Sequence, residues 1–169
     1  MESERVTDYL VLEHERLDML LAGANAGQRL NAAKFAEFRV GLLRHIAIEE
    51  KLLFPAARQA RGGIPIERAH EMRVEHAALT SLLVPTPDPG LCEEIRSLLA
   101  SHNHKEEGPD GVYAECEMLL GPAESEALRA RAVARPDVRV VPHFDGPGVY
   151  RTASLALAAA QRMRRVDRS

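Results

Sequence analysis

The stretch Leu42-Leu-Arg-His-Ile-Ala-Ile-Glu-Glu50 returns near residue 100 as Leu99-Ala-Ser-His-Asn-His-Lys-Glu-Glu107. The leucine, the histidine and both glutamates stand at matching places in the two copies. In each copy the histidine stands four residues before the first glutamate, as His45 does before Glu49. Residues at this spacing lie one turn apart on the same face of an α-helix. The repeat therefore predicts two helices that each present an imidazole beside a carboxylate.

The segments that precede these stretches are also copies of each other. Val11-Leu-Glu-His-Glu-Arg-Leu-Asp-Met-Leu-Leu21 aligns without a gap with Arg73-Val-Glu-His-Ala-Ala-Leu-Thr-Ser-Leu-Leu83. The two share a glutamate, a histidine and three leucines, and the shared histidines are His14 and His76. Each half of the chain thus contributes one histidine from its first helix and a His/Glu pair from its second.

Helical periodicity runs through four segments that glycine and proline separate. The expected helices cover about residues 8–23, a segment from the N-cap Asn31 to Gly62-Gly63, a segment that opens near Pro65, and a segment that follows the Asp88-Pro89 cap. In each of them a histidine interrupts an apolar stripe. Sustained alternation of the kind that half-buried strands show is missing from the first 121 residues. Gly108-Pro109 is expected to interrupt the fourth helix before a segment over 113–120.

The residues after Pro122 follow a different pattern. They predict a short helix over 123–134, a weak strand signal over Val138-Arg-Val-Val141, a Gly146-Pro-Gly148 loop and an alanine-rich helix from about Thr152. Five arginines and one aspartate in residues 151–169 make this end basic, which is typical of a solvated tail. We expect residues 1–121 to form one domain. Residues 122–169 would then be a C-terminal extension that packs on it or mediates a homodimer.

Composition excludes several classes of partner. Charged residues make up 28% of the chain and the formal net charge is -3, so neither nucleic acid nor an anionic membrane is an expected partner. Cys92 and Cys116 form no CxxC pair, which favours neither a disulfide framework nor a thiolate zinc site. The longest apolar run, Leu155 to Ala160, is too short for a signal peptide or a membrane span. These features predict a cytoplasmic protein.

The inward-facing polar residues point to a metal site. One histidine in an apolar stripe is more often a core residue held by one or two hydrogen bonds. Two carboxylates are harder to explain, because a buried carboxylate is costly unless it is paired or bound to a metal. Four histidines and two glutamates are the set needed to place two histidines on each of two metals, with the glutamates bridging them. The predicted metal ligands are His14, His45, Glu49, His76, His102 and Glu106.

The other histidines and a cysteine serve as internal controls for this prediction. His70 and His104 stand out of step with the helix faces that carry the predicted ligands, so we expect them to point away. His143 lies in the irregular segment. Cys116 is expected to be a buried structural thiol.

The combined pattern His14, His45-x-x-x-Glu49-Glu50, His76 and His102-x-x-x-Glu106-Glu107 resembles the hemerythrin HHE cation-binding family over about residues 5–121. This resemblance implies an all-α, up-down-up-down four-helix bundle, here with an additional C-terminal helical and irregular segment. It also implies a non-haem centre of two iron ions, bridged by both carboxylates and by an oxo or hydroxo group. Imidazole and carboxylate ligands would also accept zinc or manganese.

Two departures from the family's oxygen carriers narrow the function. A fifth histidine of the carriers is replaced here by Met72, and Glu106 follows His102 by four residues where the carriers usually place an aspartate after five. Dedicated oxygen transport is therefore disfavoured. The hypotheses that stay open are a module that binds or senses oxygen, nitric oxide or iron status, a di-iron enzyme that acts on peroxide or nitric oxide, and a metal-free helical interaction protein. Tyr9, Met72 and Tyr113 are the candidate pocket-lining residues.

Overall fold

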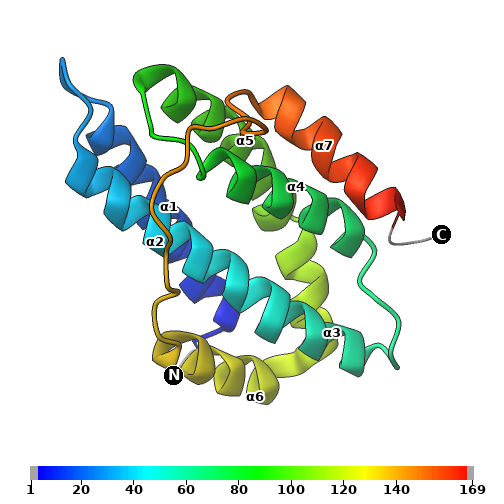
Figure 1. Ribbon diagram of the computed structural model, residues 1–169. Coiled ribbons are helices and arrows are strands. Elements are labelled where there is room, and N and C mark those ends of the chain that lie inside the picture. Colours follow the sequence, from blue (N-terminus) through cyan, green and yellow to red (C-terminus); the bar gives the residue numbers. More distant parts are fainter. Residues whose placement is uncertain (1–3, 167–169) are drawn as a thin grey trace.

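Four helical arms pack with their apolar stripes inward, and the direction of the chain alternates from each arm to the next (Figure 1). The computed structural model describes residues 4–166. Its elements are α1 (Val6–Ala24), α2 (Ala32–Ile48), η1 (Glu49–Leu53), α3 (Phe54–Ala60), α4 (Ala69–Leu82), α5 (Pro89–Glu107), α6 (Val112–Ala134) and α7 (Ala153–Val166). The second arm consists of α2, η1 and α3 in direct succession. The all-α bundle predicted from the sequence is confirmed.

Two helices, α2 and α5, begin at the capping residues that the sequence predicts. The Asn31 side chain accepts a hydrogen bond from the Lys34 amide at 3.1 Å, and Asp88 accepts one from the Leu91 amide at 2.8 Å. These bonds satisfy amides that the first helical turn leaves without a partner. Helix α4 begins at Ala69 rather than near Pro65, because the chain turns over residues 66–69: the Ala69 amide donates to the Ile66 carbonyl at 3.1 Å, and the Ile66 side chain is buried.

A wide π-helical turn, η1, lies in the middle of the second arm. The Phe54 amide donates to the Glu49 carbonyl, five residues earlier, where an α-helix would use a carbonyl four residues earlier. Pro55 follows directly, and a proline ring collides with the carbonyl four residues before it in a regular α-helix. The wider turn gives this ring room, so the arm continues through Pro55 to Ala60. Glu49, a predicted ligand, is the first residue of the turn.

A polar layer separates two apolar clusters inside the bundle. One cluster includes Leu17 and Leu42, and the other includes Leu10, Ile48 and Met72. On the first three helical arms the predicted metal ligands lie between residues of these two clusters, and on α5 they lie between Leu98 of the first cluster and Val112 of the second, at the start of α6. The polar layer is thus held in place by apolar packing on both sides.

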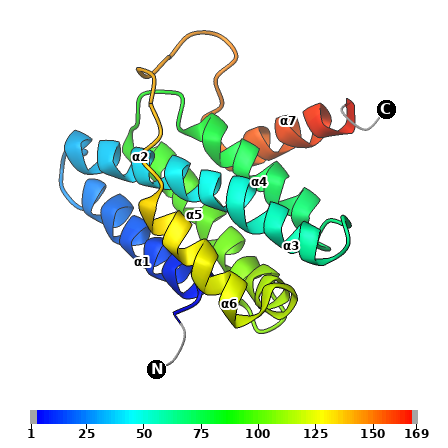
Figure 2. The ribbon, with the colours of Figure 1, turned by 90° about the horizontal axis from the view of Figure 1, so that it is seen from below.

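The C-terminal part wraps around the bundle. Helix α6 passes across one end of it and bends at Gly121, whose positive φ of 72° suits a residue without a side chain (Figure 2). The chain then runs along the outer face of α2, and α7 packs against α4 and α5 (Figures 1 and 2). The weak strand signal at 138–141 is wrong: no strand occurs among residues 4–166, and the Val141 carbonyl accepts instead from the Arg39 side chain at 2.8 Å. No helix in the described range has the length and apolarity that a membrane crossing requires.

Arg44 fastens the end of α6 to the bundle. Its side chain donates to the carbonyls of Ala132, Val133 and Arg135 at 2.9, 3.2 and 2.9 Å. A third nitrogen donates to the Tyr9 hydroxyl at 2.8 Å. A cation at the C-terminus of a helix also interacts favourably with the helix dipole. This residue therefore connects the C-terminal extension to the centre of α2.

We expect the Arg44→Lys protein to be less stable than the wild type by roughly 2–3 kcal/mol in the free energy of unfolding, because lysine cannot donate to several carbonyls from a planar fork. Urea unfolding with a chelator present measures this without a contribution from metal. Arg16, whose side chain is 48% exposed, is the matched control, and Arg16→Lys should change the value by less than about 0.5 kcal/mol. Equal losses in the two variants would contradict the role given to Arg44.

Candidate metal centre

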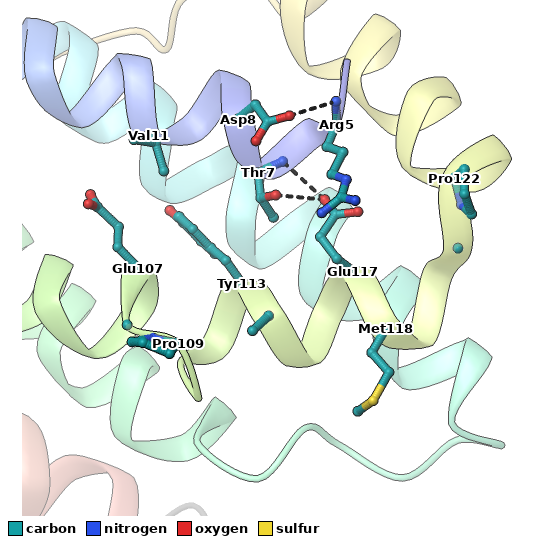
Figure 3. Close-up of a pocket in the computed structure, with 13 residues that line it drawn as sticks. Arg5, Thr7, Asp8, Val11, Glu107, Pro109, Tyr113, Glu117, Met118 and Pro122 are labelled. Atoms are coloured by element: carbon teal, nitrogen blue, oxygen red, sulfur yellow. Dashed lines mark hydrogen bonds between the residues drawn. The ribbon is translucent and has the colours of Figure 1, made fainter. Parts of the chain in front are cut away.

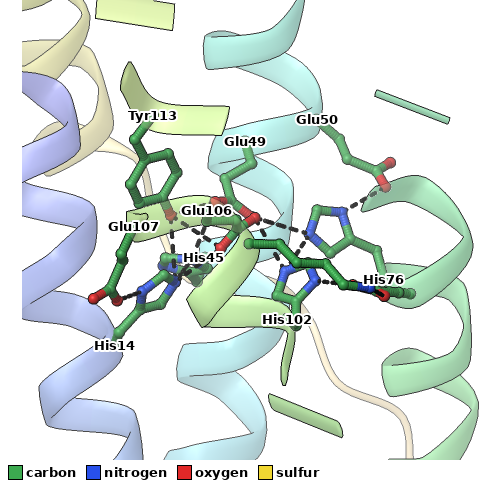
Figure 4. A network of polar contacts seen from close by, with 11 residues as sticks. His14, His45, Glu49, Glu50, His76, His102, Glu106, Glu107 and Tyr113 are labelled. Atoms are coloured by element: carbon green, nitrogen blue, oxygen red, sulfur yellow. Dashed lines mark hydrogen bonds and ion pairs between the residues drawn. The ribbon is translucent and has the colours of Figure 1, made fainter. Parts of the chain in front are cut away.

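All six predicted metal ligands meet in the polar layer (Figure 4). They come from all four helical arms: His14 from α1, His45 and Glu49 from the second arm, His76 from α4, and the last two from α5. Each is at most 5% exposed. The six residues are His14, His45, Glu49, His76, His102 and Glu106.

The six residues form two overlapping groups that could each hold a metal ion. The first contains His14 and His45, and the second contains His76 and His102. Glu49 and Glu106 belong to both groups, and in each group the nearest nitrogen and oxygen atoms lie within 4.8 Å of one another. The arrangement has the two-fold character that the internal repeat predicts, with the carboxylates shared between the halves.

The distances between the histidine nitrogens fit a metal ion in each half. His14 Nε2 lies 2.9 Å from His45 Nε2, and His76 Nε2 lies 3.2 Å from His102 Nε2. Two nitrogens about 2.1 Å from one metal, at a right angle, are about 3.0 Å apart. Without a cation or a shared proton, two nitrogen lone pairs at this distance would repel each other. This spacing suits each pair of imidazoles to a shared metal ion.

The carboxylates carry buried oxygens that also suit a cation. Glu49 Oε2 and Glu106 Oε1 accept no hydrogen bond from the described residues. The nearest histidine nitrogens lie 3.1 Å and 3.0 Å from them, close enough for an ionic contact but not aligned for a hydrogen bond. Acceptor oxygens buried without a donor are costly. A metal ion between the halves would satisfy both.

Three further carboxylates orient the histidines, and sequence reasoning had given them no role. Glu107 lies 2.5 Å from His14 Nδ1, Glu50 lies 3.0 Å from His76 Nδ1, and Glu75 lies 2.8 Å from His102 Nδ1. Such outer partners fix the ring so that Nε2 faces the metal. We call these three residues the bracing glutamates. The doubled glutamates and the repeated Glu-His pair were the sequence signal that could have found them.

The charges in the centre are strongly coupled. Burial by itself would raise the pKa of Glu49, but His45 and His76 outweigh it and hold that pKa well below its usual range. Burial by itself would lower the pKa of His76, yet Glu49 and Glu50 raise it to about 8. Glu106 and Glu75 raise the pKa of His102 to about 10. In the metal-free protein, protons on these imidazoles thus balance the buried carboxylates at neutral pH.

We expect the metal-free protein to lose stability as the pH rises from 6 to 8.5. A histidine whose pKa is higher in the folded state stabilises the fold below its unfolded pKa of about 6.5, and this contribution disappears as the pH passes through the folded value. For His76 the loss is about 2 kcal/mol when complete, from a folded pKa of about 8. Urea unfolding with chelator at the two pH values measures it. Equal stability at both pH values, or the same slope after His76→Asn, would contradict the assignment.

Tyr113 places a hydroxyl directly at the centre. It donates to Glu49 Oε1 at 2.6 Å and lies 3.3 Å from both His14 Nε2 and Glu106 Oε2. Burial, together with Glu106 and Glu49, raises the pKa of Tyr113 well above its usual value, so the hydroxyl keeps its proton. Of the three pocket-lining candidates, Tyr9 is engaged with Arg44 and Met72 is packed in the apolar core.

A cavity of about 520 Å³ opens beside this tyrosine (Figure 3). Tyr113 and Glu107 line it, together with residues from the start of α1 and from α6. A second cavity, of about 320 Å³, is lined by His14 and Glu107. The larger cavity lies between α1 and α6 and the smaller one between α1 and α5, so a small molecule can approach the His14 side of the centre.

The control residues lie outside the centre. His70 and His104 are exposed, and neither belongs to the two groups. His143 lies near Phe35 at the far end of the bundle, with its Nδ1 3.3 Å from the Val84 carbonyl. Cys116 is fully buried, burial raises the pKa of its thiol, and it is not among the grouped residues.

Comparison with known proteins finds one family model that matches this chain. A family model described as the hemerythrin HHE cation-binding domain matches residues 5–109, a span that contains all six residues. Neither the curated proteins nor the solved structures give a significant match.

Proposed function

Since the chain belongs to the hemerythrin HHE cation-binding family, we propose that its centre holds two iron ions and binds a small diatomic ligand such as oxygen or nitric oxide. His14 and His45 would hold one ion and His76 and His102 the other, with Glu49 and Glu106 shared between them. The observation that carries this proposal is the pair of overlapping groups with two carboxylates in common. When bound, iron supplies a redox-active ion with a coordination position left open for such a ligand.

The accessible side of the centre supports ligand binding. His14, Tyr113 and Glu107 line the two cavities, and Tyr113 keeps its proton, which it donates to Glu49 here and would redirect to a bound ligand. The apolar clusters above and below the polar layer exclude water from the rest of the site. Met72, in place of a fifth histidine, leaves one potential ligand position unfilled. These features favour binding or sensing over dedicated oxygen transport.

Metal quantification combined with absorption spectroscopy tests the proposal. Protein purified without chelator should contain about two iron ions per chain, and its reduced form should change its absorption spectrum on exposure to oxygen or nitric oxide. Imidazole and carboxylate donors also accept zinc and manganese, so the identity of the ion is part of the measurement. Protein that takes up no metal, even when iron(II) is added without oxygen, would contradict the proposal and favour a metal-free interaction protein.

An enzyme that acts on peroxide or nitric oxide is the second candidate. It is favoured by one observation, the protonated Tyr113 hydroxyl that lies beside both the centre and the larger cavity, where it could supply a proton. Stopped-flow mixing separates the two functions. Sustained consumption of peroxide or nitric oxide would support the enzyme, and a stable adduct would support the sensor.

We expect Tyr113→Phe to keep two metal ions but to release the bound diatomic ligand about tenfold faster, since a lost hydrogen bond to a charged or polarised group costs about 1.5 kcal/mol. The release rate, measured by stopped flow against a trapping agent, checks this. Tyr9→Phe is the matched control, because the Tyr9 hydroxyl contacts Arg44 instead of the centre. Equal release rates in both variants would show that Tyr113 does not contact the ligand.

A further inference from the structure

The two halves of the centre differ in one brace. In the internal repeat, Glu13 corresponds to Glu75 and His45 corresponds to His102. Glu75 lies 2.8 Å from His102 Nδ1. The matching contact between Glu13 and His45 is absent, and His45 Nδ1 is buried with no hydrogen-bond partner in the described part of the chain. The repeat predicts a bracing glutamate at His45 Nδ1, but in the structure Glu13 does not contact this atom.

Two arginines explain why Glu13 does not brace the histidine. Arg16 donates to both oxygens of the Glu13 carboxylate, at 3.1 Å each, and Arg44 approaches it to 3.7 Å. Arg44 is itself fixed by its bonds to the end of α6. The second half has Ser101 in the place of Arg44, and there the matching glutamate pairs with Lys105 through one oxygen and keeps its other oxygen for the histidine. The C-terminal extension thus helps to keep Glu13 away from His45.

The remaining braces are the same in the two halves. Glu107 holds His14 and Glu50 holds His76, each across to the other half of the repeat. One pair of ligands, His76 with His102, is therefore braced on both rings. The other pair, His14 with His45, is braced on one ring only. Loss of such an outer partner typically lowers metal affinity by about 10–100-fold.

We infer that the two metal positions are unequal: the His76–His102 position binds first and tightly, and the His14–His45 position is the weaker and exchangeable one. This inference rests on the proposed two-metal centre. The weaker position is also the one whose histidine lines a cavity. The exchangeable ion therefore faces the route by which small molecules arrive. Such a centre could report metal availability through the occupancy of one position.

Titration of the metal-free protein with cobalt(II), against a competing chromophoric chelator, tests the inference. We expect two ions to bind in two steps with affinities at least about tenfold apart. His14→Ala should keep the tight step, and His76→Ala should remove it. Two steps of equal affinity, or loss of the tight step in His14→Ala, would overturn the inference while leaving a two-metal centre intact. Protein that binds no cobalt would instead contradict the proposed function.

Unequal affinities could also arise because the first bound ion repels the second. Two variants at equivalent repeat positions distinguish this repulsion from the effect of the bracing glutamates. Glu75→Gln should weaken the tight step by about tenfold and bring the two steps together. Glu13→Gln should change neither step by more than about twofold, since Glu13 contacts arginines and no ligand. A Glu75→Gln protein with an unchanged tight step would overturn the inference, as would a Glu13→Gln protein with a weakened second step. Thermal melting of both metal-free variants checks that they fold.

Discussion

The His102→Ala protein is expected to retain less than one metal ion per chain and to unfold at a markedly lower temperature than the wild type. His102 Nε2 lies 3.0 Å from Glu106, one of the two shared carboxylates, so the substitution removes a predicted ligand and the nearest histidine to this buried charge. Breaking a buried ion pair costs about 3–5 kcal/mol. Metal that binds only the folded state adds its own stabilisation, which the variant loses as well.

The other histidines of the chain give the controls for this experiment. His104 is two residues from His102 on the same helix, but its side chain is exposed. His70 lies in the first turn of α4, six residues before His76, and is exposed as well. Metal content and melting temperature of His70→Ala and His104→Ala should match those of the wild type. Inductively coupled plasma mass spectrometry and thermal melting give both values. Loss of metal in either control, or unchanged metal in His102→Ala, would mean that the ligand set is wrong.

The six central residues could be predicted because helical spacing and an internal repeat constrain them. The spacing of His45 and Glu49 fixes them on one helix face whatever the rest of the chain does. Four such faces in one short chain have few ways to bury their apolar stripes other than against one another. The polar residues on these stripes then come together in one layer. Local geometry and burial were therefore sufficient for this part of the structure.

The bracing glutamates could not be placed in the same way. Glu50 contacts His76, 26 residues later, and Glu107 contacts His14, 93 residues earlier. Such contacts depend on the register between helices, which side-chain packing in three dimensions sets and which no single-helix pattern contains. Tyr113 was a candidate only as a pocket-lining residue. Its direct contact with Glu49 depends on where α6 begins after the Gly108–Gly111 interruption.

The C-terminal extension was the least predictable part. The segment Val138 to Val141 has β-branched residues typical of a strand, but a strand needs a second strand to pair with. Here the arginines of α2 donate hydrogen bonds to backbone carbonyls of this region instead. The contacts of Arg44 could not be predicted from the sequence either. It is an unremarkable residue of an amphipathic helix in the sequence, yet it connects three carbonyls to the neighbourhood of a predicted ligand.

The adjacent glutamates Glu106 and Glu107 are expected to respond very differently to the same substitution. Glu106 belongs to both metal-binding groups and is 0% exposed, whereas Glu107 contacts only the outer nitrogen of His14. Glu106→Gln should lower the metal content from about two ions to less than one, because a neutral amide offers one oxygen where the carboxylate offers two and cannot be shared between two cations. Glu107→Gln should keep both positions and weaken only one of them, by about tenfold.

The Glu106→Gln variant, compared with Glu49→Gln, also distinguishes one shared centre from two independent metal sites. If each half held its ion separately, Glu106→Gln would remove one ion and leave the other with its original affinity. If the carboxylates are shared, both ions weaken together, and Glu49→Gln repeats the result from the opposite half, since Glu49 stands in both groups as well. Cobalt(II) titration of the two variants gives the answer directly. Retention of one full-affinity ion in both would replace the two-metal centre with two mononuclear sites.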